Sequence, residues 1–260
     1  MHPAVVPKAL RGWVIPVALL VYWWAAYYFH VNESPLFVSM GQVAKTALKL
    51  GKSGELWHAL SASLYRMLMG FTLGSLAGLI VGGGLGLSRR FEGLVGPTFH
   101  AIKQVSLLAW IPLISLWFGL GDTAKIAFLS LAAFFPLALN TFEGIRSVQR
   151  EFVEVAHVFA YSRWQLFRRV VLPAALPSIF TGVQLALIYS WLATLGAEFL
   201  LTSGVGIGNL LIDGREHLWM DYVLLGIAIV GIVGFVLQGI AQQIETRLLG
   251  IRSRTLGKPI

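Results

Sequence analysis

The sequence predicts an all-α integral membrane protein with about six transmembrane helices. The first observation is composition: of the 260 residues, 57% are hydrophobic and 12% are charged, and the mean hydropathy is +0.74. An aqueous domain of this length cannot bury so much apolar surface. The second observation is that apolar runs of roughly 20 residues, long enough to cross a bilayer core as a helix, alternate with short polar connections.

Residues 1–58 are predicted to hold a first span and an amphipathic segment on the outer side. Lys8 and Arg11 precede an apolar run from Trp13 to Phe29 that is rich in aromatic side chains. No small-residue cleavage site follows, so the run indicates an uncleaved span with an aromatic belt, not a secretory signal. The more polar residues 30–57 predict a helix on the membrane surface.

Five further spans are expected in the core, residues 59–248. The second span, roughly 59–87, carries glycines four residues apart, and such a row permits close helix packing. These glycines are Gly70, Gly74, Gly78 and Gly82. A specific dimer face and the general tolerance of glycine in membrane helices both stay open as interpretations of this row. The other spans run from about Leu94 to Gly119, with interruptions at Pro97, Lys103 and Gln104, and over about 123–142, 178–201 and 222–248.

The basic residues orient these spans. With both termini in the cytoplasm, 14 of the 20 lysines and arginines lie on the cytoplasmic side, as the positive-inside rule requires. They are Lys8, Arg11, Arg89, Arg90, Lys103, Arg146, Arg150, Arg163, Arg168, Arg169, Arg247, Arg252, Arg254 and Lys258. The basic residues that set this topology account for the formal net charge of +8. They do not form a continuous basic stripe, so the sequence does not indicate a nucleic-acid partner. Residues 143–177 become a cytoplasmic loop and residues 249–260 a cytoplasmic tail.

The loop 143–177 has the pattern of a docking element. If residues 151–160 form a short helix, Ala156 and Ala160 share one face, where small side chains let a partner's backbone approach. Glu154 lies near the start of that helix, where the macrodipole favours a carboxylate, and arginines follow its end. We therefore expect a small apolar surface between charges.

Prolines separate this loop from the fifth span. Pro173 and Pro177 each disfavour an uninterrupted helix, so the loop is predicted to be a separate segment. The alternative is a loop whose arginines only satisfy membrane topology.

The spacing of this loop resembles that of a known family. The run Glu154-Val155-Ala156 to Ala160, followed after nine residues by Val170-Val171-Leu172-Pro173, resembles the E-A-A-x-x-x-G and I-x-L-P pattern of permease subunits of ATP-binding-cassette importers. Val155 and Ala160 depart from it. The resemblance implies a type I importer permease fold in which the loop holds a cytoplasmic coupling helix. The ATPase-coupling residues would be Glu154, Ala156, His157, Ala160, Tyr161, Arg163, Leu172 and Pro173.

The substrate branch and the partners also follow from resemblance. The segment Leu108-Ala109-Trp110-Ile111-Pro112-Leu113 to Leu116-Trp117-Phe118-Gly119 resembles the sulfonate, nitrate and taurine importers. This implies a small anionic solute, with an aliphatic sulfonate as the first choice. It also implies two copies of a multi-pass inner-membrane subunit, surrounded by lipid, bound to a cytoplasmic ATPase dimer and served by an outer solute-binding protein.

Catalytic motifs are missing from the sequence. There is no G-x-x-x-x-G-K-[ST] run, so ATP with its magnesium would be bound by the partner, and this subunit is expected to be neither an enzyme nor a cofactor carrier. The histidines do not fall at metal-ligand spacing, and the absence of cysteine excludes thiolate sites. A membrane-embedded enzyme therefore ranks below transport.

The fifth span carries the candidate path residues: Gln184, Tyr189, Ser190, Trp191, Thr194 and Glu198. Ordinary helix packing is the alternative for each. Glu198 should lie at the outer end beside Ser203–Gly208, either accepting backbone N–H groups of that loop or contacting an amine on the substrate. The second function that we weigh, an ion-coupled secondary transporter, requires buried ionisable residues at the membrane midplane, and Glu198 is its sole candidate.

Overall fold

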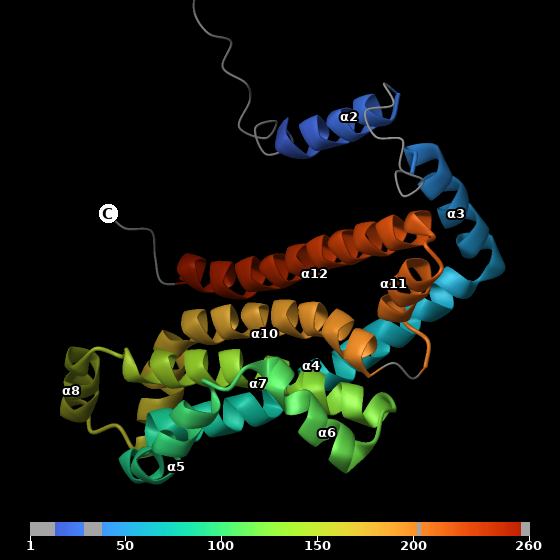
Figure 1. The fold of residues 1–260 in the computed structure, drawn as a ribbon. Helices are drawn as coiled ribbons and strands as arrows, with labels where there is room; N and C mark the ends of the chain where they lie inside the picture. Colours follow the sequence, from blue (N-terminus) through green and yellow to red (C-terminus); the bar gives the residue numbers. More distant parts are fainter. Residues whose placement is uncertain (1–13, 29–37, 202–203, 256–260) are drawn as a thin grey trace, which may run out of the picture.

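The protein, seen here as a computed structural model, is described over residues 14–28, 38–201 and 204–255 (Figure 1). Regular structure in these ranges is helical, which confirms the all-α prediction. Within them, four helices are long and apolar enough to cross a membrane. They are α4 (Glu55–Leu87), α7 (Asp122–Arg146), the run Arg163–Leu200 that contains α10 (Leu172–Leu200), and α12 (Met220–Thr255).

The N-terminal segment is helical where it is described. Helix α2 (Val14–Tyr28) has 15 residues and lies within the predicted first span. The flanking residues of the predicted span, Trp13 and Phe29, lie outside the described residues. Next comes α3 (Met40–Ser53), the expected amphipathic helix, which begins with a capping box between Ser39 and Gln42.

The centre of the molecule is α7, which packs between α4 and α10 (Figure 1). The glycine row of α4 faces α7: a Cβ at Gly78 would lie 2.8 Å from the carbonyl oxygen of Phe134. At Gly74 an added Cβ would lie 2.9 Å from the Cβ of Ala133. Close packing therefore explains these glycines, and it takes place inside the subunit.

The third predicted span is broken. It consists of α5 (Arg89–Ile102), then η1 (Leu107–Trp110) and α6 (Ile111–Phe118), and the two parts bend by 96°. The break begins at Lys103, where the turn is closed by hydrogen bonds from the N–H groups of Gln104 and Val105 to Ala101 and Ile102. Pro112 stands in the first turn of α6, where its missing N–H costs nothing. Counted as one broken span, this pair makes the fifth candidate in the described chain.

The predicted break at Pro173 and Pro177 is wrong. Helices α9 (Arg163–Leu166), η2 (Phe167–Val171) and α10 follow one another directly, and the whole run Arg163–Leu200 is helical over 38 residues. Pro173 lies in the first turn of α10. The π-helical turn η2 shifts the hydrogen-bond register just before it, so that this proline does not interrupt the run.

The two ends of the bundle carry different elements. Helix α8 (Arg150–Val158), which follows α7, lies at one end, and α11 (Ile207–Glu216) packs against α10 and α12 at the other (Figure 1). At the α11 end, the Thr46 hydroxyl of α3 donates to the Asp221 carboxylate of α12. At the α8 end, Arg146 pairs with Glu92.

Candidate functional site

The helix within the predicted coupling loop is α8, and it ends in a left-handed turn. The backbone N–H of Tyr161 donates to the Ala156 carbonyl at 3.0 Å, and the N–H of Ala160 donates to His157 at 2.9 Å. Ala160 itself has φ 53°, a conformation that glycine adopts without strain. The E-A-A-x-x-x-G pattern that this loop resembles has a glycine at this position. Here an alanine adopts the positive φ that a glycine would adopt without strain.

This turn gives a stability prediction. Ala160→Gly should raise the free energy of unfolding by about 1 kcal/mol, since a left-handed alanine costs roughly 1–2 kcal/mol and glycine recovers part of that. Thermal unfolding of the purified protein measures the change. Ala174→Gly, at an exposed helical position, is the control and should instead lower stability by about 1 kcal/mol. Equal destabilisation by both variants would contradict the prediction.

The small face expected from Ala156 and Ala160 is not formed. Ala156 is buried, with 3% of its surface exposed, whereas Ala160 is exposed. The physical reason is that α8 ends at Val158, so the left-handed turn takes Ala160 off the helical face that it was predicted to share.

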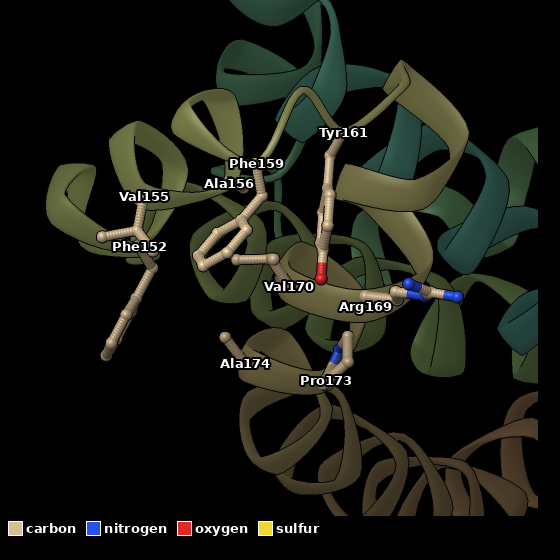
Figure 2. Close-up of a pocket in the computed structure, with 9 residues that line it drawn as sticks. All are labelled: Phe152, Val155, Ala156, Phe159, Tyr161, Arg169, Val170, Pro173 and Ala174. Carbon is tan, nitrogen blue, oxygen red and sulfur yellow. The ribbon is translucent and has the colours of Figure 1, made fainter.

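A groove lies between α8 and the first turn of α10 (Figure 2). Its volume is about 490 Å³, and its less exposed lining residues include Ala156, Val170 and Pro173. The Arg169 guanidinium lies over the Tyr161 ring, 5.6 Å from its centroid. The lining residues are Phe152, Val155, Ala156, Phe159, Tyr161, Arg169, Val170, Pro173 and Ala174.

The groove unites three of the predicted coupling residues, Ala156, Tyr161 and Pro173. Glu154, His157 and Arg163 are exposed on the same loop but do not line it, and Leu172 is half-buried. Sequence reasoning missed the apolar side chains: Phe152, Val158 and Phe159 are 56%, 85% and 70% exposed. The apolar residues among the arginines of this loop were the signal in the sequence that could have indicated these side chains.

A second cluster of functional interest lies at the opposite end of the bundle, around Glu198. This carboxylate is fully buried and accepts hydrogen bonds from Ser63 Oγ at 2.7 Å and from Arg66 Nη1 at 2.5 Å. It also accepts from the backbone N–H of Gly208 at 2.7 Å, the kind of contact that the sequence predicted for it. Arg66 Nε donates to Asp122 Oδ1 at 2.7 Å. We call Ser63, Arg66, Asp122, Lys125 and Glu198 the outer charge cluster.

The loop before α11 closes over this cluster. Arg66 Nη2 donates to the Val205 carbonyl at 2.5 Å, and the Ile207 N–H donates to Ser63 Oγ at 3.0 Å. A Cβ at Gly206 would overlap the Glu198 carboxyl group, and one at Gly208 would lie 2.6 Å from the Cβ of Glu198. The glycines are therefore required by the close approach of this loop to a buried charge.

Lys125 is the unexpected member of the outer charge cluster. It falls within the predicted span 123–142, and it lies in the first turns of α7 with none of its surface exposed. A Cβ built on Gly204 would lie within 4 Å of Arg66, Asp122 and Lys125 alike. The cluster thus holds two cations and two carboxylates, and its formal charges balance.

Most predicted path residues pack inside the subunit. Ser190 Oγ donates to the Leu129 carbonyl at 3.4 Å, Trp191 Nε1 to Val230 at 3.0 Å, and Thr194 Oγ1 to Ser190 at 2.9 Å. The Gln184 amide donates to the Glu245 carboxylate. Tyr189 differs, because half of its surface is exposed and it lines another cavity.

Comparison with known proteins explains this architecture. Residues 70–250 match the family of binding-protein-dependent transport system inner membrane components. The chain belongs to this family. It is thus an inner-membrane permease subunit of an ATP-binding-cassette importer, a transport component of a family that works with an ATPase and a binding protein. The sequence-based alternatives of a secondary transporter and a membrane enzyme are thereby set aside.

Relatives of the permease carry different substrate names. It is 35% identical over 244 residues to the putative aliphatic sulfonates transport permease protein of Bacillus subtilis (strain 168), covering 94% of this chain and 88% of that one. It is also 35% identical to the taurine transport system permease protein of Escherichia coli (strain K12), covering 88% and 85%. Others are named as bicarbonate and nitrate permeases.

The permease also shares its fold with a solved transporter. The crystal structure of an amino acid ABC transporter with histidines aligns over 76% of this chain and 96% of that one. The TM-score is 0.62 and the sequence identity is 17%, so the likeness concerns the fold. Within the described part of the permease, no group of three His, Asp or Glu side chains could hold a metal ion.

Proposed function

We propose that the permease forms, together with a second copy of itself, the path by which a small oxyanion is imported, with an aliphatic sulfonate as the first candidate and taurine or nitrate as alternatives. Support comes from the names of the relatives above and from the run Leu108–Gly119. Both termini would lie in the cytoplasm. The solute-binding protein would then meet the end of the bundle that holds α11, and lipid would cover exposed apolar side chains such as Phe235.

Coupling to ATP hydrolysis is assigned to α8 and its groove. The observation that carries this assignment is the exposed apolar surface of Phe152, Val158 and Phe159 on a loop that also carries exposed arginines. Exposed apolar patches rimmed by charges mark protein interaction sites. The partner would be a cytoplasmic ATPase dimer that binds ATP with magnesium, so that this subunit needs no cofactor of its own.

The test removes one apolar contact from α8. Val158→Asp should reduce co-elution of the ATPase with the permease at least tenfold, since a charge would replace apolar contact area at the proposed interface. Insertion into the membrane should be unchanged, because the Val158 side chain is 85% exposed in the free subunit. Co-expression, affinity purification and quantification of both subunits provide the measurement.

The control is Leu48→Asp, the same kind of change at a 63% exposed position on α3, far from the loop. It should leave co-elution intact. Normal co-elution of the Val158 variant would remove the coupling role from α8, and transport by a permease that binds no ATPase at all would refute the proposed function.

A further inference from the structure

The break in the third span places a lysine at the middle depth of the bundle. Lys103 caps the C-terminus of α5, and sequence reasoning counted it among the cytoplasmic cations. In the structure it lines a cavity together with Leu131 and Pro136 from the centre of α7 and Tyr189 from α10. These partners lie well inside their helices, away from both the α8 end and the outer charge cluster. An ionisable side chain at such a depth is costly and is a mark of function.

This cavity has the composition of a binding site for a small anion. Its volume is about 430 Å³, and the polar residues in its described lining are Lys103, which carries an ammonium group, and Tyr189, which carries a phenol. The remaining lining is apolar and includes Leu131, Phe135 and Leu192. Binding sites for small molecules commonly combine an apolar wall with a few placed polar groups.

The charge of Lys103 is not balanced by a neighbouring acid. Within the described residues, no carboxylate lies within ion-pair distance of its ammonium, in contrast with Arg66 and Arg146. An ammonium offers three donors and one positive charge, and a phenol offers one further donor. Together they match the several acceptor oxygens of a monoanion and do not neutralise a dianion.

We propose that Lys103 and Tyr189 bind the transported oxyanion inside the path, the ammonium on its oxygens and the apolar wall on an alkyl chain. This inference rests on the proposed function, because it names a contact for the imported solute. It favours monovalent oxyanions, and an unsubstituted alkanesulfonate above taurine, because none of the described residues that line the cavity is acidic and could receive the taurine amine. Nitrate, which has no alkyl chain, would contact the Lys103 ammonium but not the apolar wall of the cavity.

The first part of the test separates binding of the anion from energy coupling. The complete transporter is reconstituted into proteoliposomes, and uptake of radiolabelled ethanesulfonate and of nitrate is measured beside ATP hydrolysis stimulated by the loaded binding protein. Lys103→Gln should lower uptake about tenfold or more while hydrolysis is retained, because a charge-assisted contact to the anion is lost. Lys103→Arg should keep most uptake. Arg90→Gln, an exposed charge lost from the first turn of the same helix, is the matched control and should behave as wild type.

The second part uses the absence of cysteine from this chain. Lys103→Cys should lose uptake, and 2-aminoethyl methanethiosulfonate, which restores a positive charge, should recover it, whereas methyl methanethiosulfonate should not. Ethanesulfonate should also slow the labelling. Wild-type transporter treated with both reagents controls for cysteines in the partner subunits.

Each outcome of these experiments supports or overturns a stated proposal. Normal uptake by Lys103→Gln, or equal recovery with the charged and the neutral reagent, would overturn the proposal. Loss of ATP hydrolysis together with uptake would make Lys103 a structural residue and would overturn it as well. A wild-type transporter that hydrolyses no ATP and imports neither anion would instead refute the proposed function.

Discussion

Glu198→Gln is expected to abolish uptake and to lower the free energy of unfolding by about 3–5 kcal/mol, the usual cost of removing one partner from a buried ion pair. The amide keeps the size of the side chain and still accepts a hydrogen bond from Gly208. It leaves Arg66 and Lys125 buried with only Asp122 to balance them, and 57% of the Asp122 side chain is exposed. Thermal unfolding in detergent and uptake in proteoliposomes measure the two effects.

The choice of substrate tells whether Glu198 is structural. If the outer charge cluster closes the loop before α11, uptake of taurine and of ethanesulfonate should fall alike. Selective loss of taurine would show instead that Glu198 contacts the substrate amine. Asp122→Asn is the matched control: it removes the other carboxylate on Arg66, but at a partly solvated position, and the expected loss of stability is much smaller.

A double variant distinguishes an unpaired charge from a lost contact. Arg66→Met combined with Glu198→Leu removes one cation and one carboxylate together, so the cluster stays neutral. The double variant should therefore be less destabilised than the sum of the two single variants. Additive losses would indicate that the two side chains contribute independently.

Gly74→Ala should also have a large effect, lowering stability by about 1–3 kcal/mol through overpacking of α4 against α7. The added methyl group would meet the backbone of Ser130 and the Cβ of Ala133, and neither can move without displacing α7. Gly83→Ala offers a matched control on the same helix, since nothing lies within 4 Å of its added Cβ.

The control should show the opposite sign. Alanine is favoured over glycine in a helix by about 1 kcal/mol, so Gly83→Ala should be neutral or stabilising. The midpoint of thermal unfolding in the same detergent compares the pair. If both substitutions changed stability alike, the glycine row would reflect general tolerance of glycine and not close packing.

Sequence reasoning succeeded where local pattern decides the structure. Apolar length predicted α4, α7 and α12, and the row of glycines predicted a face for close packing. It failed at Pro173, because the π-helical turn that accommodates this residue depends on hydrogen-bond register, which composition does not report. It also failed at Ala160, where a helix that ends two residues earlier than expected leaves the side chain off the predicted face.

The two sites were predictable to different degrees. The coupling loop is a continuous stretch, so its residues were found together, although which side chains are exposed was not. The outer charge cluster joins Arg66 to Glu198 across 132 residues of sequence, and only the packing of α4, α7 and α10 brings them together. Ser63 and Arg66, three apart on one helix face, were the sole local hint. The cavity that Lys103 shares with Tyr189 was not predicted, because a hydropathy pattern does not report a bend of 96°.

The helical run Arg163–Leu200 joins the two sites within one element. From Pro173, which lines the groove of α8, to Glu198 it covers about 25 residues, or roughly 38 Å of helix. If α10 tilts as one body by about 5° at the groove, Glu198 moves by about 3 Å over such a length. That displacement is as large as the hydrogen-bond distances that hold the loop before α11, so a small movement at the groove is enough to break the contacts of Glu198.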